Sequence, residues 1–384
     1  FSQSFSPPLV PDMQRTPGYP VFLMLLGRSP FWILLVQHLL VLAAAWFLYK
    51  AAADLYGHRV ASSGAKLYLL QPYPVILASY VLSEVLFVFL LIVAVWAYLR
   101  FWKGAGWHML AISMGVLSLG AMVRPVALPL LVAAVLLAIV HLRRLPRQRF
   151  VQAALATLLP VLLLGPWFLR NQQLSGRLTF STMGEMGMLH GRLGGLQAWR
   201  SGREMHEHEF YMAGDSIAAE SMGLTDLRHY PEGKQTHETE QLAGGMGGMT
   251  FQFFLRHPWD AIRFEAWAGW QMFKGVGYGW ARELTLCKPV AVLAAGLQLL
   301  CNLLMFLGAL LAVVRWREWT GAEGLVFGSI FLVLIISAAA WADGRYRMVI
   351  DPLILLLAMF PLRRQEKIQA STTFDAVHIQ PIQS

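Results

Sequence analysis

The sequence predicts an all-α protein that crosses a membrane many times, and three observations lead to this prediction. Of the 384 residues, 57% are hydrophobic and only 14% are charged, and the mean hydropathy is +0.51. An ordinary soluble domain carries about 25% charged residues, so that class is excluded. The apolar residues gather in runs that approach the about 20 residues needed for a membrane span. The basic residues fall in short connections between those runs.

Nine apolar runs are candidate spans, at residues 31–49, 67–82, 84–99, 107–122, 125–142, 150–168, 289–314, 324–341 and 346–362. We therefore expect five parts: an external N-terminal segment (1–30), a transmembrane bundle of six spans (31–168), a large external loop domain (169–288), three C-terminal spans (289–362) and a cytoplasmic tail (363–384). The chain begins with Phe1 rather than Met and no short signal peptide precedes the first apolar run, so we also expect the true N-terminus to lie upstream of this numbering.

The orientation of the spans follows from the connections that carry basic residues. Every second connection is basic, as the positive-inside rule requires of cytoplasmic loops; the residues are Lys50, Arg59 and Lys66, then Arg100 and Lys103, then Arg143, Arg144, Arg147 and Arg149, then Arg315 and Arg317, and finally Arg363, Arg364 and Lys367. These loops account for the net charge of +9, so no nucleic-acid partner is implied. The alternate connections, including 169–288 and 342–347, then face outward.

The predicted loop domain holds 13 of the 22 acidic residues. Within it, residues 251–275 interleave Phe and Trp with basic residues, which suits interfacial helices but also an ordinary amphipathic helix packed on the loop domain. The HEHE sequence at 206–209 lacks the spacing of a zinc-binding H-E-x-x-H helix, so we interpret it as a solvated face and predict no metal site there. Cys287 and Cys301 lie about 21 Å apart along one predicted helix and cannot form a disulfide.

Several charged residues lie where the predicted spans end on the outer side. Glu84 opens a span and Arg124 precedes a proline. Each charge is costly alone and their spans are close in the sequence, so we expect the two side chains to approach each other at the outer rim. A structural pair, or for Arg124 an interface anchor, is the alternative to a functional role. The stretch WADGRYRMVIDP (341–352) contains Arg345, Tyr346 and Arg347, a combination suited to holding phosphate. Headgroup contact is the alternative, but two outer arginines oppose the positive-inside trend. Asp351 lies four residues beyond Arg347, the spacing of a helical ion pair.

Five short motifs carry a resemblance to a known family. They are RTPGYPVFLMLL (15–26), the Ser83–Glu84 pair, MVRP (122–125), GPWFLRNQQLSGRLTFSTMGEMGMLHG (165–191) and GRYRMVIDP (344–352). In this order they resemble bacterial membrane glycosyltransferases of the GT-C superfamily, in the group related to dolichyl-phosphate-mannose protein mannosyltransferases and the lipid A aminoarabinose transferase. The resemblance implies a GT-C-like transmembrane bundle with a catalytic face on the external side.

The resemblance also implies a reaction and its partners. A polyprenyl-phosphate-linked sugar would be the donor, and a lipid, glycan or protein the acceptor, in the bilayer of a bacterial cytoplasmic membrane with the active site on the periplasmic side. We assign the donor phosphate to Arg15, Arg124, Arg345, Tyr346 and Arg347, and name Glu84 as a catalytic candidate. The family places its catalytic carboxylate in the first external loop, after a first transmembrane helix that the resemblance implies is missing from this numbering. Asp12 is the sole acid before Arg15, so we name it as a second catalytic candidate and expect the usual carboxylate upstream of Phe1.

The function expected from the sequence is therefore transfer of a sugar from a lipid-phosphate donor on the external membrane face. A polysaccharide ligase or polymerase of the cell envelope is an alternative, although PGYP near the start is not expected of one. A secondary transporter is a further alternative, but it would place charges at the membrane midplane and broken helices in both halves. The sequence predicts no cofactor and leaves the use of a divalent metal open.

Overall fold

A computed structural model describes residues 15–142, 147–176, 178–202, 207–221, 248–285, 287–341 and 347–363 of the chain. The described part is all-α, as the sequence predicts, and it is a polytopic membrane protein. The first group of helices is α1 (Gly18–Leu25), α2 (Pro30–Tyr56), α3 (His58–Leu70), α4 (Pro72–Ala78), α5 (Glu84–Trp102), α6 (Trp107–Val123), α7 (Ala127–Leu142), α8 (Arg147–Ala156) and α9 (Leu159–Ser175).

Shorter helices follow and then the chain returns to the bundle. We call the group from α10 to α15 the loop domain; it comprises α10 (Met183–Met186), a π-helical segment (Gly187–Gly194), α11 (Gly195–Arg200), α12 (Glu207–Ser221), α14 (Pro258–Lys274) and α15 (Tyr278–Thr285). The chain ends with α16 (Lys288–Val314), a 3₁₀ turn (Trp316–Glu318), α17 (Gly321–Trp341), α19 (Asp351–Ala358) and a second 3₁₀ turn (Phe360–Leu362).

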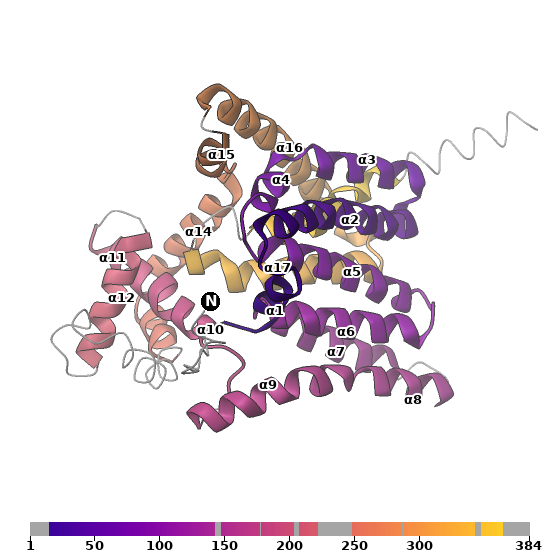
Figure 1. Ribbon diagram of the computed structural model, residues 1–384, viewed down its shortest axis with the longest axis horizontal. Coiled ribbons are helices and arrows are strands. Elements are labelled where there is room, and N and C mark those ends of the chain that lie inside the picture. Colours follow the sequence, from indigo (N-terminus) through magenta and orange to yellow (C-terminus); the bar gives the residue numbers. More distant parts are fainter. Residues whose placement is uncertain are drawn as a thin grey trace, which may run out of the picture.

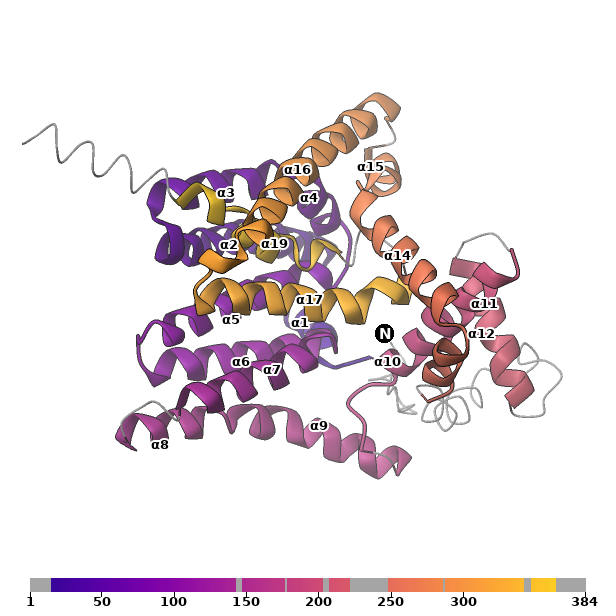
Figure 2. The same ribbon diagram turned by 180° about the vertical axis from the view of Figure 1, so that it is seen from behind.

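The loop domain lies at one end of the bundle. In Figures 1 and 2 most bundle helices run alongside one another, and α10, α11, α12 and α14 gather beyond one end, which we call the loop-domain end. The bundle is built around α19, in which all residues from Asp351 to Leu357 are buried. A helix that is apolar around its circumference is stable only when other helices surround it. By contrast, α16 exposes many leucines, as a helix facing lipid does.

The predicted spans appear in three forms among the described residues. Four are helical stretches long and apolar enough to cross a membrane, at Pro30–Tyr56, Glu84–Trp102, Phe150–Leu174 and Lys288–Val314. The third of them is interrupted by a turn at Thr157–Leu158, between α8 and α9. Four are shorter apolar helices, at Trp107–Val123, Ala127–Val140, Gly321–Ile335 and Asp351–Leu362. The run 67–82, predicted as a single span, is broken at Gln71, which has extended backbone (ψ 121°). Pro72 causes the break because a residue before proline is disfavoured in the helical conformation.

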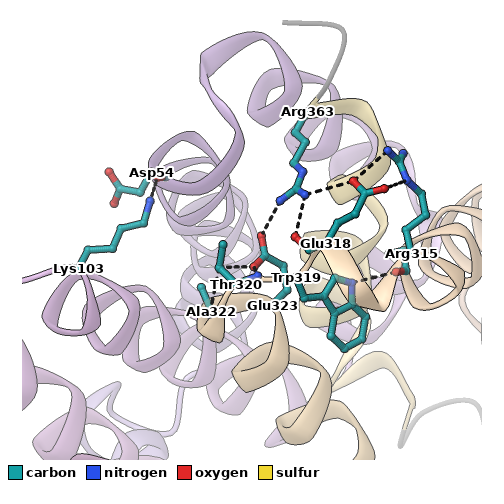
Figure 3. Close-up of polar contacts among 10 residues, drawn as sticks. Asp54, Lys103, Arg315, Glu318, Trp319, Thr320, Ala322, Glu323 and Arg363 are labelled. Carbon is teal, nitrogen blue, oxygen red and sulfur yellow. Dashed lines mark hydrogen bonds and ion pairs between the residues drawn. The ribbon is translucent and has the colours of Figure 1, made fainter. Parts of the chain in front are cut away.

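The bundle end opposite the loop domain is fastened by a charged network around Arg363 (Figure 3). Gly321, which begins α17, lies against the ring of Trp102, which ends α5, so this network is a full span away from Glu84. Arg363 lies 3.5 Å from a carboxylate oxygen of Glu318 and 3.6 Å from one of Glu323, and its guanidinium stacks on the Phe360 ring at 3.8 Å.

Glu323 has a second role at the start of α17. Its carboxylate accepts hydrogen bonds from the backbone N–H of Thr320, at 2.8 Å, and from the Thr320 hydroxyl. This is the geometry of a capping box, in which a Glu three residues into the helix satisfies the N-cap backbone. The same carboxylate therefore caps α17 and holds the last part of the bundle in place through Arg363.

This arrangement predicts which sites face the same side of the membrane. In a Cys287→Ser and Cys301→Ala background, single cysteines at Ser201 in the loop domain and at Gly344, which lies outside the described residues, should react with a membrane-impermeant thiol reagent from outside the cell. A cysteine at Arg317, at the opposite end, should react only after permeabilisation. Labelling of Ser201→Cys and Arg317→Cys from one side would contradict the arrangement.

Candidate functional site

The RTPGYP stretch packs directly on the MVRP stretch at the loop-domain end of the bundle. A Cβ atom placed on Gly18 would lie 2.6 Å from the carbonyl carbon and oxygen of Met122 and 2.8 Å from the backbone nitrogen of Val123. Contacts that short force the backbone to move, so only glycine fits where α1 meets the end of α6. Two motifs that are about a hundred residues apart in the sequence are thus joined backbone to backbone.

Glu84 and Arg124 form an ion pair beside this contact. Pro125 disfavours helical backbone at Arg124, which is extended (φ −143°, ψ 123°) and ends α6. Its guanidinium Nη1 lies 2.8 Å from Oε1 of Glu84, which stands in the first turn of α5. The Glu84 side chain is 4% exposed and that of Arg124 is 16% exposed. The expectation that these two costly charges pair at the end of their spans is therefore confirmed.

Tyr19 extends the cluster around the pair. Burial, and then the neighbouring Glu84 carboxylate, raise the pKa of the Tyr19 phenol above its ordinary value. The hydroxyl donates a hydrogen bond to Oε1 of Gln37 at 2.9 Å. Because Tyr19 follows Gly18 directly, the close packing of α1 on α6 also holds this phenol near Glu84.

Gln37 was missed by the sequence reasoning. It is completely buried in α2 and its amide nitrogen donates to the carbonyl oxygens of Ala78, at 3.0 Å, and Tyr80, at 2.6 Å. It thereby fixes the end of α4, from which the chain enters the turn to Glu84. A glutamine inside the apolar run PFWILLVQHLL is costly unless it is bonded, and that signal was present in the sequence.

Arg347 is arranged differently from the prediction. Its side chain has no exposed surface; Nε lies 3.0 Å from Oδ1 of Asp351, which confirms the predicted i, i+4 pair. Nη1 donates to the carbonyl oxygen of Phe273 at 2.8 Å, and the guanidinium lies 5.7 Å from the Phe306 ring centre. We therefore revise the phosphate-holding role predicted for Arg347: protein groups surround the guanidinium, and it joins α14, α16 and α19.

Of the remaining predicted site residues, the structure describes Arg15 alone. Arg15 is exposed, four residues before Tyr19 on the same segment. Asp12, Arg345 and Tyr346 lie outside the described residues. Within the described ranges, no group of three or more His, Cys, Asp and Glu side chains could hold a metal ion; of the HEHE stretch, His206 lies outside them.

A second arginine, Arg192, joins the loop domain to the bundle. It lies in the π-helical segment, donates to the backbone carbonyl of Ile335 in α17, and has Nε 3.4 Å from Oε1 of Glu265 in α14. Burial raises the pKa of Glu265, and the charge of Arg192 opposes that rise. In the same segment, buried His190 has Nε2 2.9 Å from Oδ1 of Asp215 in α12. The sequence reasoning named neither pair.

Helix α14 combines the two alternatives left open for residues 251–275. One face packs on α11 and α12 through Ala261 and Phe264, in a small core with Leu196, Ala198 and Phe210. The other face exposes Trp259 (73%) and Trp270 (64%). Packing on the loop domain is thus observed, and the exposed tryptophans suit the polar–apolar boundary of a membrane.

Comparison with known proteins relates the first part of the chain to one family. The family model described as dolichyl-phosphate-mannose-protein mannosyltransferase matches residues 15–167. No curated protein matches the chain, and no solved structure matches it. The matched region contains the RTPGYP stretch, Glu84 and Arg124, and ends before the loop domain. The match supports a membrane glycosyltransferase.

The Glu84–Arg124 pair should behave as one energetic unit. Arg124→Gln alone removes this arginine from the buried Glu84 carboxylate, which costs about 3–5 kcal/mol of unfolding free energy. Glu84→Gln alone should cost less, because the Arg124 side chain is 16% exposed. The double substitution should cost less than the sum of the single ones, with a coupling of about 0.5–3 kcal/mol in chemical or thermal unfolding of the purified protein. Strict additivity would mean that the two side chains do not stabilise each other.

Replacing Arg347 should lower the unfolding free energy of the protein, because its role is structural. Arg347→Met leaves Asp351 buried and unpaired, so we expect a loss of about 3–5 kcal/mol in unfolding free energy. Adding Asp351→Leu should restore much of that loss, because a buried pair can be replaced by apolar side chains. Arg317→Met, on an exposed side chain, is the matched control and should unfold like the wild type. An Arg347→Met protein of wild-type stability would refute this role.

Proposed function

Because residues 15–167 relate the chain to the GT-C superfamily of membrane glycosyltransferases, we propose that it transfers a sugar from a polyprenyl-phosphate donor to a lipid, glycan or protein acceptor. The proposed location is the external face of a bacterial cytoplasmic membrane, with the loop-domain end outward, as the alternation of basic connections indicates. The main support for the proposal is one observation. The Gly18–Tyr19 segment, Glu84 and Arg124 come together at one rim of the bundle.

Arg124 is the proposed holder of the donor phosphate, with Arg15 on the adjoining segment as a second cation. A guanidinium presents several N–H donors in one plane, and its bond to Glu84 through Nη1 fixes the direction in which that plane faces. The Arg124 side chain keeps 16% of its surface exposed, so an anion can approach it at the rim. The role proposed for Glu84 is therefore to orient Arg124.

The reaction itself requires a base and a leaving group. An acceptor hydroxyl or amine would attack the anomeric carbon of the sugar while the bond from that carbon to the phosphate oxygen breaks. The electron pair would leave with the polyprenyl phosphate, whose charge Arg124 and Arg15 would stabilise. The acceptor proton would pass to a carboxylate. Asp12, three residues before Arg15, is the candidate for that role. Arg345 and Tyr346 are candidates for further phosphate contacts.

The charges of the described helices do not favour the transporter alternative. Breaks in the predicted spans lie in both halves of the chain, at Gln71 and Thr157–Leu158 and at Val349–Ile350, but a transporter would also place charges at the membrane midplane. The side chains bonded near the first break are neutral amides: Oε1 of Gln298 accepts from the backbone N–H of Tyr73 at 3.0 Å, and Nε2 of Gln298 donates to Asn302 at 2.8 Å. Among the described ion pairs, those formed by Glu84, Arg124 and Arg347 lie at the loop-domain end, where interfacial chemistry would occur.

Transfer from a panel of polyprenyl-phosphate sugars by the full-length protein in lipid vesicles tests the proposal. Arg124→Ala should lower the rate of polyprenyl phosphate release by about 10²–10³-fold, the usual cost of removing one group that stabilises developing charge. Arg124→Lys should fall between Arg124→Ala and the wild type, because lysine keeps the charge but not the planar fork.

Two further variants sharpen the measurement. Arg345→Ala should also reduce transfer if that residue contacts the phosphate, without loss of expression or membrane insertion. Arg317→Ala, an exposed arginine at the opposite end of the bundle, is the control and should retain wild-type transfer. Wild-type rates in Arg124→Ala would rule out the phosphate role of Arg124, and absence of transfer by the wild type from every polyprenyl-phosphate sugar would rule out the donor class.

A further inference from the structure

The buried side chain of Gln37 in α2 joins two segments near the rim of the bundle. Its Oε1 accepts a hydrogen bond from the hydroxyl of Tyr19 in α1 at 2.9 Å, and its Nε2 donates to the backbone carbonyls of Ala78 at 3.0 Å and Tyr80 at 2.6 Å. The residue has no exposed surface, so water does not compete for these bonds. One amide therefore fixes α1 relative to the end of α4.

The first of these segments leads to Arg124. Tyr19 follows Gly18, at which a Cβ atom would lie only 2.8 Å from the backbone nitrogen of Val123. Arg124 is the next residue after Val123, and its extended backbone ends α6. Because α1 packs so closely on the end of α6, the bond from Tyr19 to Gln37 also fixes the backbone that carries the Arg124 guanidinium.

The second segment leads to Glu84. The backbone carbonyl of Tyr80 accepts the N–H of Leu82 at 2.9 Å as well as the Gln37 amide, so two donors hold this carbonyl. Glu84 stands four residues after Tyr80, as the first residue of α5. A connection this short has little reach, so fixing its start restricts where the Glu84 carboxylate lies.

We propose that Gln37 is a positioning residue that sets the Glu84 carboxylate against the Arg124 guanidinium and thereby aims that guanidinium at the donor phosphate. The inference rests on the proposed function, because that function gives Arg124 its ligand. Gln37 acts on the pair through the backbone of α1 and of the connection between α4 and α5. Apolar packing alone has little directional preference, whereas hydrogen bonds constrain both distance and angle.

Unfolding of the purified full chain tests the positioning without any substrate. The matched control is Gln298→Met, because Gln298 is also completely buried and also forms hydrogen bonds through both Oε1 and Nε2. Both Gln→Met variants should unfold at a lower temperature than the wild type.

Only Gln37→Met should also reduce the energetic coupling between Glu84 and Arg124, to less than about half of its wild-type value. The coupling is measured with the single and double Gln variants of the pair. A structural role alone would lower stability and leave the coupling intact, so an unchanged coupling in Gln37→Met would overturn the inference.

Transfer by the full-length protein in lipid vesicles tests the link to the phosphate. With the polyprenyl-phosphate sugar that the wild type uses, Gln37→Met should lower kcat/KM for release of polyprenyl phosphate by about 10–10²-fold, since a displacement of about 1 Å can cost that much. In an Arg124→Lys background the same substitution should cost less than about threefold, because lysine has no planar fork to aim. Gln298→Met should have the same effect in both backgrounds.

The outcomes separate the positioning role from the reaction. Equal costs of Gln37→Met in the wild-type and Arg124→Lys backgrounds would overturn the inference and leave the proposed function in place. Absence of transfer by the wild type from every polyprenyl-phosphate sugar would overturn the proposed function and the phosphate role of the pair with it. If Gln37→Met does not fold, Tyr19→Phe, which removes one of the three hydrogen bonds of Gln37, carries the same expectations in both measurements.

Discussion

The arrangement of this protein depends on one constraint: a charge buried in an apolar bundle must be paired. The constraint is satisfied at both ends. At the loop-domain end, Glu84 pairs with Arg124 and Arg347 with Asp351; at the opposite end, Arg363 lies between Glu318 and Glu323. Glu84–Arg124 joins α5 to the end of α6, Arg363 joins the chain end to the start of α17, and Asp351 holds the Arg347 guanidinium against α14. Apolar packing has little directional preference, so these ion pairs help to determine which helix ends meet.

Arginines also determine how the loop domain sits on the bundle. Arg347 reaches from the start of α19 to the backbone carbonyls at the end of α14, and Arg192 reaches from the π-helical segment to α17. A cation near the C-terminal carbonyls of a helix is favourably placed with respect to the helix dipole. Arg192, which precedes α14 in the chain, and Arg347, which follows α17, thus both contact α14 and hold the loop domain on the bundle.

The rim and the bundle interior differ in how their polar groups are held. At the rim, side chains hold one another: Gln37 accepts a hydrogen bond from Tyr19, and Glu84 pairs with Arg124. Deeper in the bundle, the hydroxyls of Tyr98, Ser113 and Ser329 donate to backbone carbonyls of the helices. These hydroxyls are satisfied within the protein, as an apolar interior requires.

The sequence by itself determined the fold class, the positions of most spans and two of the ion pairs. Composition and apolar runs are enough for the first two, because a bilayer demands continuous apolar length. The pairs followed because Asp351 stands one helical turn after Arg347, and because Glu84 and Arg124 were each costly alone at neighbouring span ends. The family resemblance also came from the sequence, through short motifs in order, and the match over residues 15–167 supports it.

Only the tertiary structure decided what those residues contact. The break at Gln71 depends on Pro72, although the residues on both sides form one apolar run in the sequence. The backbone N–H of Tyr73 at the start of α4 donates to the side chain of Gln298, more than two hundred residues away. The complete burial of Arg347 depends on carbonyls of α14 that no local pattern could place beside it. In the sequence Gly18 was only one residue of the RTPGYP motif. The structure gives the physical reason for a glycine there, because a side chain would collide with the backbone of Met122. Long-range contacts of this kind are set by how the helices pack, which spacing along the chain does not encode.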